Sequence, residues 1–218
     1  MSQPSSIASA RLYAFVDTGY LRGRKPEEAV AQLCEGGADV VQLRAKNSGV
    51  AEVRQMAKAI LPVTRGAGVN FVVNDHLAIA QEVGADFCHL GQEDFFGAGF
   101  TDVPTLKQDY PGIGIGLSTH SRGQAEQAEA AEADYIAIGP VYPTGTKPQA
   151  KPVTLDLVHW AAESINVPWF AIGGITLENL DGVLSAGARR ICVVSAILNA
   201  PSIIKACQEF KRRLLSVA

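Results

Sequence analysis

The segment GADVVQLRAK, residues 37–46, contains the pattern that decides the fold. A Gly-Ala-Asp turn leads into a short apolar run, and polar residues follow where that run ends. Similar triplets precede apolar runs at residues 84–86, 132–134 and 187–189. The triplet returns about every two strand-helix units, a period that a barrel assembled from duplicated pieces predicts and an open doubly wound sheet does not.

Eight short apolar runs alternate with longer amphipathic stretches along the chain, as in a parallel sheet built from strand-helix units. The expected strands are residues 11–17, 39–44, 70–75, 87–92, 114–119, 135–140, 168–175 and 190–197. We therefore expect an α/β fold, a (β/α)8 TIM barrel, in a single domain of residues 1–218. Residues 1–10 are expected to be a short N-terminal extension.

Local signals place several of the helices between these strands. Pro26 suits a first helical position and Gly36-Gly37 supplies a stop, so a helix is expected between them. The Ala/Glu/Gln-rich residues 121–131 predict another helix, and residues 104–110 a further one. The Gly-rich and aromatic residues 95–101 are expected to form an irregular loop or a flexible lid.

Composition and charge argue against several classes of function. The net charge of −3, with no Lys/Arg-rich run, leaves no electrostatic footprint for nucleic acid or an anionic membrane. The opening residues do not have the form of a secretory signal, and no apolar stretch approaches the roughly 20 residues of a membrane-spanning helix. The four scattered cysteines lack C-x-x-C spacing and are interpreted as reduced, mostly buried thiols. These features favour a cytoplasmic protein that binds neither nucleic acid nor membranes.

Three polar residues alternate at the end of the second expected strand: Gln42, Arg44 and Lys46. If the extended geometry persists, their side chains point the same way, into the mouth of the barrel. One interpretation is a network of salt bridges at the top of the barrel. The other is a pocket for an anionic substrate, because Arg and Lys are the side chains that bind anions.

Five of the aspartates fall into two groups by their place relative to the strands. Asp39, Asp86 and Asp134 enter strands at the bottom of the barrel, where polar residues serve stability. Asp75 and Asp94 instead follow strand ends, on the face where barrels of this kind build their active sites. Only the second group is therefore a candidate for chemistry.

Asp75 and Asp94 leave neighbouring strands and are expected to approach one another beside Arg44 and Lys46. Mg²⁺ takes one or two carboxylates together with phosphate oxygens and waters, so the pair predicts a Mg²⁺ site completed by a diphosphate. The alternative is that Asn74-Asp75 caps the helix that begins near His76.

Further anion-binding groups follow the later strands. Ser118 ends the fifth strand, where it or Ser121 either caps the next helix or donates to phosphates. The loop of residues 139–147 carries two threonines and ends in Lys147, a cation able to neutralise a leaving anion. Glycines and amides after the seventh and eighth strands, at residues 173–174 and 194–195, predict a phosphate cradle.

The histidines are less informative. His159 is interpreted as a surface residue, whereas His89 and His120, near strand ends, either support the site or serve only the structure. No histidine is assigned as a base.

Seven motifs in order resemble those of the thiamine-phosphate synthase family, and the resemblance runs from Arg11 to the C-terminal helix. They are VVQLRAK (40–46), VVND (72–75), HLGQED (89–94), GLSTH (116–120), GPVYPTGTK (139–147), AIGGI (171–175) and VVSAI (193–197). That family condenses hydroxymethylpyrimidine diphosphate with a thiazole phosphate, using Mg²⁺ and releasing diphosphate. The resemblance therefore implies a transferase of thiamine biosynthesis with these two small-molecule substrates, and a homodimer.

The resemblance also implies a role for each matching residue. Gln42 would contact the pyrimidine, and Asp75 with Asp94 would hold the metal. The diphosphate would be bound by Arg44, Lys46, Asn74, Ser118 and Lys147, among which Arg44, Lys46, Ser118 and Lys147 would be catalytic. The thiazole phosphate would be bound by Thr144, Thr146 and amides at Gly174, Val194 and Ser195. No protein nucleophile is needed, because the electron-rich pyrimidine ring can share positive charge while the diphosphate departs.

One departure from the family and two rival functions bear on this interpretation. Thr154 stands where the family commonly has a glycine ahead of the next helix, so the loop after the sixth strand is expected to close differently. A thiazole tautomerase would use a histidine in the Gly-x-Val loop where this chain has Pro140. A non-catalytic barrel that binds thiazole or thiamine phosphate would not need the metal carboxylates.

Overall fold

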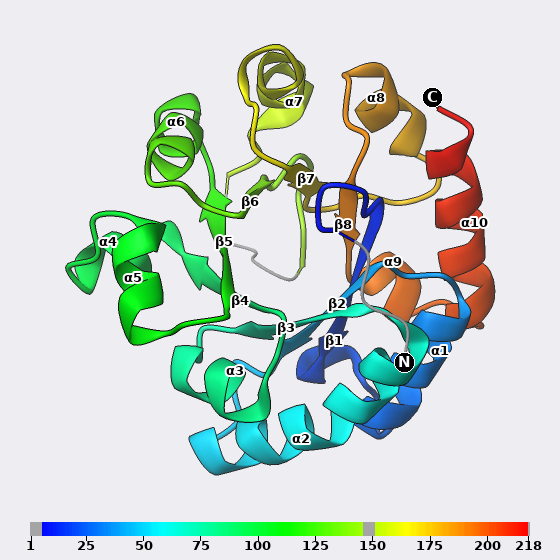
Figure 1. Ribbon diagram of the computed structural model, residues 1–218. Coiled ribbons are helices and arrows are strands. Elements are labelled where there is room, and N and C mark those ends of the chain that lie inside the picture. Colours follow the sequence, from blue (N-terminus) through cyan, green and yellow to red (C-terminus); the bar gives the residue numbers. More distant parts are fainter. Residues whose placement is uncertain (1–5, 146–150, 218) are drawn as a thin grey trace.

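The chain forms a closed barrel of eight parallel strands with helices around it (Figure 1). The structure is a computed structural model, and it describes residues 6–145 and 151–217. The strands pair in sequence order, and the last strand pairs with the first to close the barrel. The predicted single-domain (β/α)8 barrel is therefore confirmed.

Each strand lies within a range expected from the sequence. The bounds are β1 Leu12–Asp17, β2 Val40–Arg44, β3 Asn70–Asn74, β4 Phe87–Gly91, β5 Gly114–Thr119, β6 Tyr135–Ile138, β7 Trp169–Ile172 and β8 Ile191–Val193. The last two strands end earlier than expected. Gly173 and Gly174 turn the chain with positive φ angles of 102° and 65°, and Val194 begins the turn into a helix.

The helices form an outer ring around the barrel (Figure 1). Their bounds are α1 Pro26–Glu35, α2 Val50–Ala67, α3 Leu77–Val83, α4 Gln92–Gly97, α5 Val103–Asp109, α6 Arg122–Ala130, α7 Thr154–Ser164, α8 Leu180–Ser185, α9 Ser195–Leu198 and α10 Ile203–Leu215. A short 3-10 helix, η1 Thr18–Tyr20, follows β1. Within the part of the chain that the structure describes, none of these helices combines the length and apolarity needed to cross a membrane.

The helix predictions are confirmed in three places and wrong in one. Pro26 opens α1, which stops at the glycine pair, and α5 and α6 occupy the expected ranges. Residues 95–101 were expected to be an irregular loop or a lid; this is wrong for residues 95–97, which α4 covers, whereas residues 98–101 lie in a turn and irregular structure. The reason is packing, because Phe95 is buried and its ring contacts those of Phe96 and Phe100 with centroids 5.0 and 5.6 Å away.

The repeated triplets share one backbone conformation. Their first residues all have a positive φ: Gly37, Gly84, Glu132 and Gly187. This left-handed turn ends one helix and aims the chain into the next strand. The sequence repeat is therefore a repeat of the turn at the bottom of every second strand.

The aspartates of these triplets hold neighbouring strands together at the bottom of the barrel. Asp39 Oδ2 accepts hydrogen bonds from the backbone N–H groups of Arg11 and Leu12 at 2.8 and 2.9 Å. Asp86 and Asp134 accept in the same way from the strands before their own, at 2.7 and 2.6 Å. The prediction that these carboxylates serve stability is confirmed.

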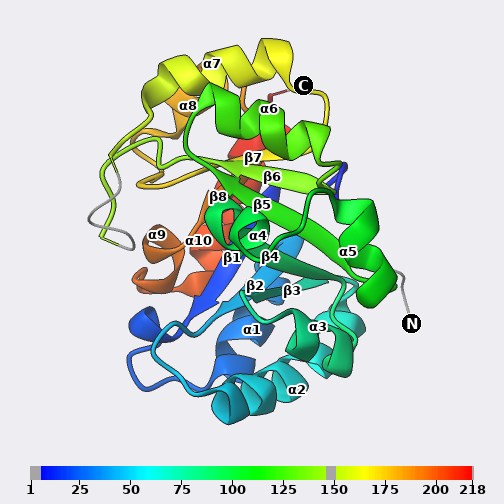
Figure 2. The same ribbon diagram turned by 90° about the vertical axis from the view of Figure 1, so that its left-hand side faces the viewer.

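The barrel interior and the layer between strands and helices are separate cores. Most buried aliphatic residues lie between the strands and the helices. The interior is filled by larger side chains: Tyr13, Phe15, Val40, Val72, Tyr135, Phe170 and Cys192. The loops that follow the strands gather at one end of the barrel, on the left of Figure 2, together with α9. That end is open above the aromatic interior, and the candidate site lies there.

Candidate active site

A cavity of about 870 Å³, counted with its open mouth, lies at the carboxyl ends of the strands. Most of the residues that the sequence singled out line it: Gln42, Arg44, Asn74, Ser118, Thr144, Gly174, Val194 and Ser195. Lys46, Asp75 and Asp94 lie outside this lining, and Thr146 and Lys147 fall outside the described residues. The barrel has therefore brought these residues from six of its strand ends to one cavity, which is large enough for a small-molecule substrate.

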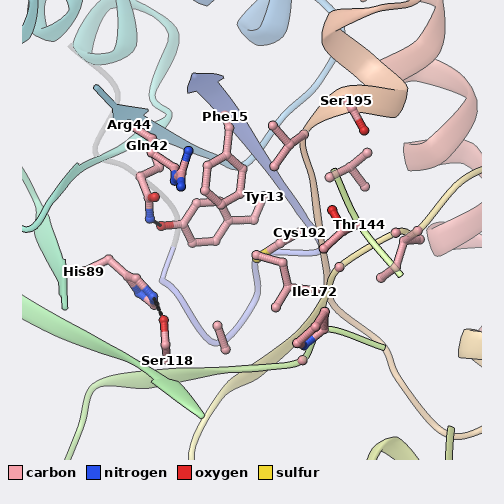
Figure 3. Close-up of a pocket in the computed structure, with 18 of the residues that line it drawn as sticks. Tyr13, Phe15, Gln42, Arg44, His89, Ser118, Thr144, Ile172, Cys192 and Ser195 are labelled. Carbon is pink, nitrogen blue, oxygen red and sulfur yellow. Dashed lines mark hydrogen bonds between the residues drawn. The ribbon is translucent and has the colours of Figure 1, made fainter. Parts of the chain in front are cut away.

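The floor of the cavity is aromatic. Tyr13 and Phe15 point inward from alternate positions of β1, and their rings stack with centroids 5.2 Å apart. Gln42 of β2 lies beside them, as Figure 3 shows, and only 1% of this residue is exposed. An apolar floor with one buried amide at its edge suits a flat ring that carries hydrogen-bonding groups.

Arg44 is held at the cavity by a carboxylate that sequence reasoning missed. Its Nη1 lies 2.6 Å from Oδ2 of Asp17, at the end of β1, while Asp17 Oδ1 accepts from the N–H of Gly19 at 2.9 Å. The Asp17 side chain is 4% exposed and that of Arg44 is 16% exposed. Strand register explains the pair, because Asp17 and Arg44 are direct neighbours across β1 and β2. The sequence did carry one signal for this pair, because two successive expected strands end in residues of opposite charge.

Lys46 and Asp75 form an ion pair at the rim of the cavity, with Nζ and Oδ2 2.5 Å apart. The alternation predicted for the second strand therefore holds for Gln42 and Arg44 and fails at Lys46, because β2 ends at Arg44. Asp75 has a φ of 65°, and its N–H donates to His89 O at 2.9 Å. The helix-capping alternative for this aspartate is wrong, since α3 begins without a side-chain cap.

Asp94 lies in the first turn of α4 and is exposed. Its Oδ2 sits 2.6 Å from the point that a Cβ on Gly91 would occupy, so only glycine allows the carboxylate to fold back over the end of β4. Among the described residues, no group of three or more His, Cys, Asp or Glu side chains is gathered for a metal. Two separate carboxylates are a poor set for Zn²⁺ but fit Mg²⁺, which completes its shell with phosphate oxygens and water.

A line of buried hydrogen bonds runs beneath the cavity and was not foreseen. Gln42 Nε2 donates to Tyr13 Oη at 2.6 Å, and Tyr13 Oη lies 3.0 Å from Tyr135 Oη. Tyr135 Oη is 3.1 Å from His89 Nδ1, and His89 Nε2 is 2.9 Å from Ser118 Oγ. In Figure 3, His89 and Ser118 point toward one another and Gln42 lies beside Tyr13. Desolvation by burial raises the pKa of both tyrosines well above its usual value, so their hydroxyls stay protonated.

Ser118 is available to the cavity because another serine caps the next helix. Ser121 is the N-cap of α6, where its side chain accepts from Gln124 N at 3.3 Å. Of the two serines that the sequence left open, Ser121 takes the capping role. Ser118 contacts His89 and lines the cavity.

The glycine pair after β7 is needed for the packing of two loops. A Cβ on Gly173 would lie 2.4 Å from Pro140 Cα, and one on Gly174 would lie 2.5 Å from Pro143 O. The loops after β6 and β7 therefore close against one another, which brings Thr144 to the cavity. In Figure 3, Thr144 and Ser195 lie across the cavity from the Gln42 and His89 side.

Thr154, the departure from the family pattern, has a φ of 63° at the first position of α7. A β-branched residue in the left-handed region is strained, and glycine would adopt this conformation without cost. The structure thus explains why glycine is suited to this position.

The chemistry of the cavity is that of charge stabilisation. Cys192 lines it, yet burial raises the pKa of the thiol well above its usual value, so a thiolate nucleophile is not supplied there. What the cavity offers is a flat apolar floor, a guanidinium, hydroxyls and loop amides. Such an arrangement can bind a ring that bears an anionic group and stabilise that group as it leaves.

Comparisons with known proteins point to one family along nearly the whole chain. The profile of the family described as thiamine monophosphate synthase matches residues 12–197. A thiamine-phosphate synthase of Acidothermus cellulolyticus is 42% identical over 219 residues, covering 98% of this chain and 99% of that protein. One of Thermus thermophilus is 43% identical over 184 residues, covering 84% and 86%. A solved structure, the thiamine phosphate pyrophosphorylase of Pyrococcus furiosus, has a TM-score of 0.84 at 32% identity, covering 98% and 99%.

Proposed function

This chain belongs to the thiamine monophosphate synthase family, and we propose how its barrel joins a pyrimidinylmethyl diphosphate to a thiazole phosphate, forming thiamine phosphate and releasing diphosphate. The observation that carries the proposal is the division of the cavity. An aromatic floor with Gln42 and Arg44 lies on one side, and Thr144 and Ser195 lie on the other. Two substrates, each with a ring and an anionic group, would face one another across such a cavity.

The pyrimidine is assigned to the aromatic floor. Tyr13 and Phe15 offer a flat apolar surface, and Gln42 beside them offers a buried amide. A buried amide must be hydrogen-bonded, so a ring with polar edges binds there better than a plain hydrocarbon ring. This placement directs the methylene diphosphate of the substrate toward Arg44.

The diphosphate is assigned to Arg44, Lys46, Asn74, Ser118 and Lys147. When the bond between the methylene carbon and the diphosphate oxygen breaks, its electron pair leaves with the diphosphate. The substrate of this family is a 4-aminopyrimidine, and its electron-rich ring and amino group share the positive charge that remains. Donors already aimed at the departing oxygens stabilise that charge without reorganising, which is the largest source of rate enhancement in such sites. Arg44 is preorganised in this way by Asp17.

Asp75 and Asp94 are the residues that would hold Mg²⁺. Bound there, Mg²⁺ would neutralise part of the diphosphate charge and make it a better leaving group. The support for this assignment is the donor set, since both carboxylates follow ends of the adjacent strands β3 and β4. Asp75 already faces a cation, because it pairs with Lys46.

The thiazole phosphate is assigned to Thr144, Thr146 and amides at Gly174, Val194 and Ser195. Val194 and Ser195 line the cavity where β8 passes into α9, the usual place of a phosphate in this fold. From there the thiazole nitrogen can supply its electron pair to the methylene carbon as diphosphate departs. The residues of this chain position the two rings and need not form a bond to either.

The test is an assay with both substrates, with Mg²⁺ and with Mg²⁺ chelated. Thiamine phosphate and diphosphate are expected in equal amounts, and both should disappear on chelation. Asp75→Asn should lose activity about 10²-fold or more, whereas Asp86→Asn, at the barrel bottom, should keep it. Binding of both substrates without release of diphosphate, or isomerisation of the thiazole alone, would contradict the proposal.

A further inference from the structure

The buried hydrogen bonds beneath the cavity form one chain with both ends in the site. It runs from Gln42 through Tyr13, Tyr135 and His89 to Ser118, with links of 2.6, 3.0, 3.1 and 2.9 Å. Its members come from the five strands β2, β1, β6, β4 and β5. Gln42 and Ser118 both line the cavity, whereas Tyr135 is fully buried and does not.

We propose that Tyr13, Tyr135 and His89 are positioning residues that link Gln42 to Ser118, so that the amide faces the substrate as an acceptor and the serine as a donor. The proposal rests on the proposed function, because it takes the pyrimidine to lie at Gln42 and the diphosphate at Ser118. It adds Tyr135, which lies outside the cavity lining, and it gives Tyr13 and His89, which line the cavity, the further role of orienting Gln42 and Ser118.

The direction of the chain follows from counting protons. A tyrosine hydroxyl has one proton, and a neutral imidazole has one N–H. With Gln42 Nε2 donating to Tyr13, the Tyr13 proton has a partner among these residues only if it points to Tyr135, and the Tyr135 proton then points to His89 Nδ1. The imidazole proton then lies on Nε2 and points to Ser118 Oγ, which leaves the serine proton free for a ligand. At the other end, Gln42 Oε1 is left to accept from a ligand.

The other state of a neutral imidazole in which every linking proton has a partner reverses every link together. Gln42 would then present its amino group to the cavity, and Ser118 would present a lone pair. An amino group on the substrate ring and a phosphate oxygen would each meet a like partner in that state. The two ends are therefore coupled, and a ligand with a donor at one end and an anion at the other selects a single polarity.

The same polarity suits the bond cleavage. As diphosphate departs, the ring amine becomes electron-poor and the leaving oxygen becomes electron-rich. Gln42 accepts from the amine and Ser118 donates to the leaving oxygen. The aligned dipoles of the hydrogen-bond chain therefore strengthen both contacts in the transition state more than in the ground state. The expected effect of breaking the chain is consequently on kcat, with little effect on KM.

The alternative is a purely structural role, in which the tyrosine rings fill the barrel and their hydroxyls hydrogen-bond only to keep one another from being unpaired. Tyr135 separates the two explanations. Its ring packs so closely on β5 that a Cβ on Gly116 would lie 2.1 Å from its Cζ, so phenylalanine fits in the same place. Tyr135→Phe removes one hydroxyl from the chain without removing any group that lines the cavity.

The experiment compares Tyr13→Phe, Tyr135→Phe and the double variant. Tyr110→Phe is the control, because Tyr110 is not part of the hydrogen-bond chain. Each single change should lower kcat about tenfold and leave KM for the thiazole phosphate unchanged. The double variant should also lose about tenfold and not about a hundredfold, because one chain can be broken only once. Multiplicative losses, or normal kcat in Tyr135→Phe, would overturn the proposal.

A second readout needs no turnover. The protein has 4 histidines, so the ¹⁵N signals of His89 can be identified by comparison with a His89→Gln variant. With the pyrimidine diphosphate bound and the thiazole phosphate left out, the protein should hold His89 as the Nε2–H tautomer, and Tyr135→Phe should lose that preference. If the unmodified protein releases no diphosphate, the proposed function is refuted. The His89 tautomer would then be the only test of the hydrogen-bond chain. An Nδ1–H tautomer, or a tautomer that Tyr135→Phe does not alter, would refute the proposal that these hydrogen bonds link Gln42 to Ser118.

Discussion

Replacing Asp17 by asparagine should weaken the barrel and misplace Arg44. The carboxylate is 4% exposed and lies 2.6 Å from a guanidinium that is 16% exposed. Removing one partner of a buried pair costs about 3–5 kcal/mol, since the other charge is left uncompensated. Asparagine can still accept from Gly19 N, and Arg44 still faces the cavity, so the expected loss is about 2–3 kcal/mol. For a chain of this length, the melting temperature should fall by roughly 4–12 °C.

The same change should impair the handling of the diphosphate. A guanidinium binds phosphate oxygens through a planar fork, which works only when the plane is held in place. Without Asp17, Arg44 can turn away, so kcat/KM for the pyrimidine diphosphate should fall about 10²-fold while KM for the thiazole phosphate stays near its original value.

The assay combines thermal unfolding by circular dichroism with steady-state kinetics for each substrate. Asp39→Asn is the control, because Asp39 also pairs with a cation, Lys211, but at the bottom of the barrel, where its side chain is 19% exposed. It should lose stability and keep both kinetic constants at a temperature well below its melting point. If Asp17→Asn is destabilised and yet handles the pyrimidine diphosphate normally, Asp17 does not position Arg44.

Four further predictions follow from single residues. Lys147→Ala should slow turnover about 10²–10³-fold with the fold intact, and a near-normal rate would remove Lys147 from the mechanism. Gly91→Ala should push the Asp94 carboxylate aside and raise the Mg²⁺ concentration for half-maximal activity about tenfold; an unchanged requirement would contradict the metal assignment. Thr154→Gly should stabilise the protein by about 1 kcal/mol in urea unfolding, and a loss would show that the φ of 63° is not strained. Because burial raises the pKa of Cys192, the thiol should be neutral and resist iodoacetamide at pH 8, and labelling should become measurable only as pH rises toward that pKa; rapid labelling by mass spectrometry would refute this.

Much of the site could be predicted because strand ends collect at one face of a barrel. Gln42 and Arg44 were placed correctly from their alternation, and Ser118 from its position at the end of β5. Lys46 does not line the cavity and instead pairs with Asp75, because β2 stops at Arg44, which hydrogen bonding with the neighbouring strands decides. The roles of individual residues toward the substrates remain predictions.

The residues that were missed are partners in long-range contacts. Asp17 pairs with Arg44 through strand register, and no local pattern marks a buried aspartate as the partner of one particular arginine. Tyr13 and Tyr135 looked like ordinary apolar strand positions, but their hydroxyls meet from positions 122 residues apart.

The order and direction of the strands and the turn that recurs before every second strand were determined by sequence alone. Their signals are local: the period of the apolar residues, and turn residues that take a positive φ. Tertiary structure alone decided which polar groups share a hydrogen bond inside the barrel. Those pairings depend on barrel closure and on the register of each strand with its neighbour, and both arise only when all eight strands have come together.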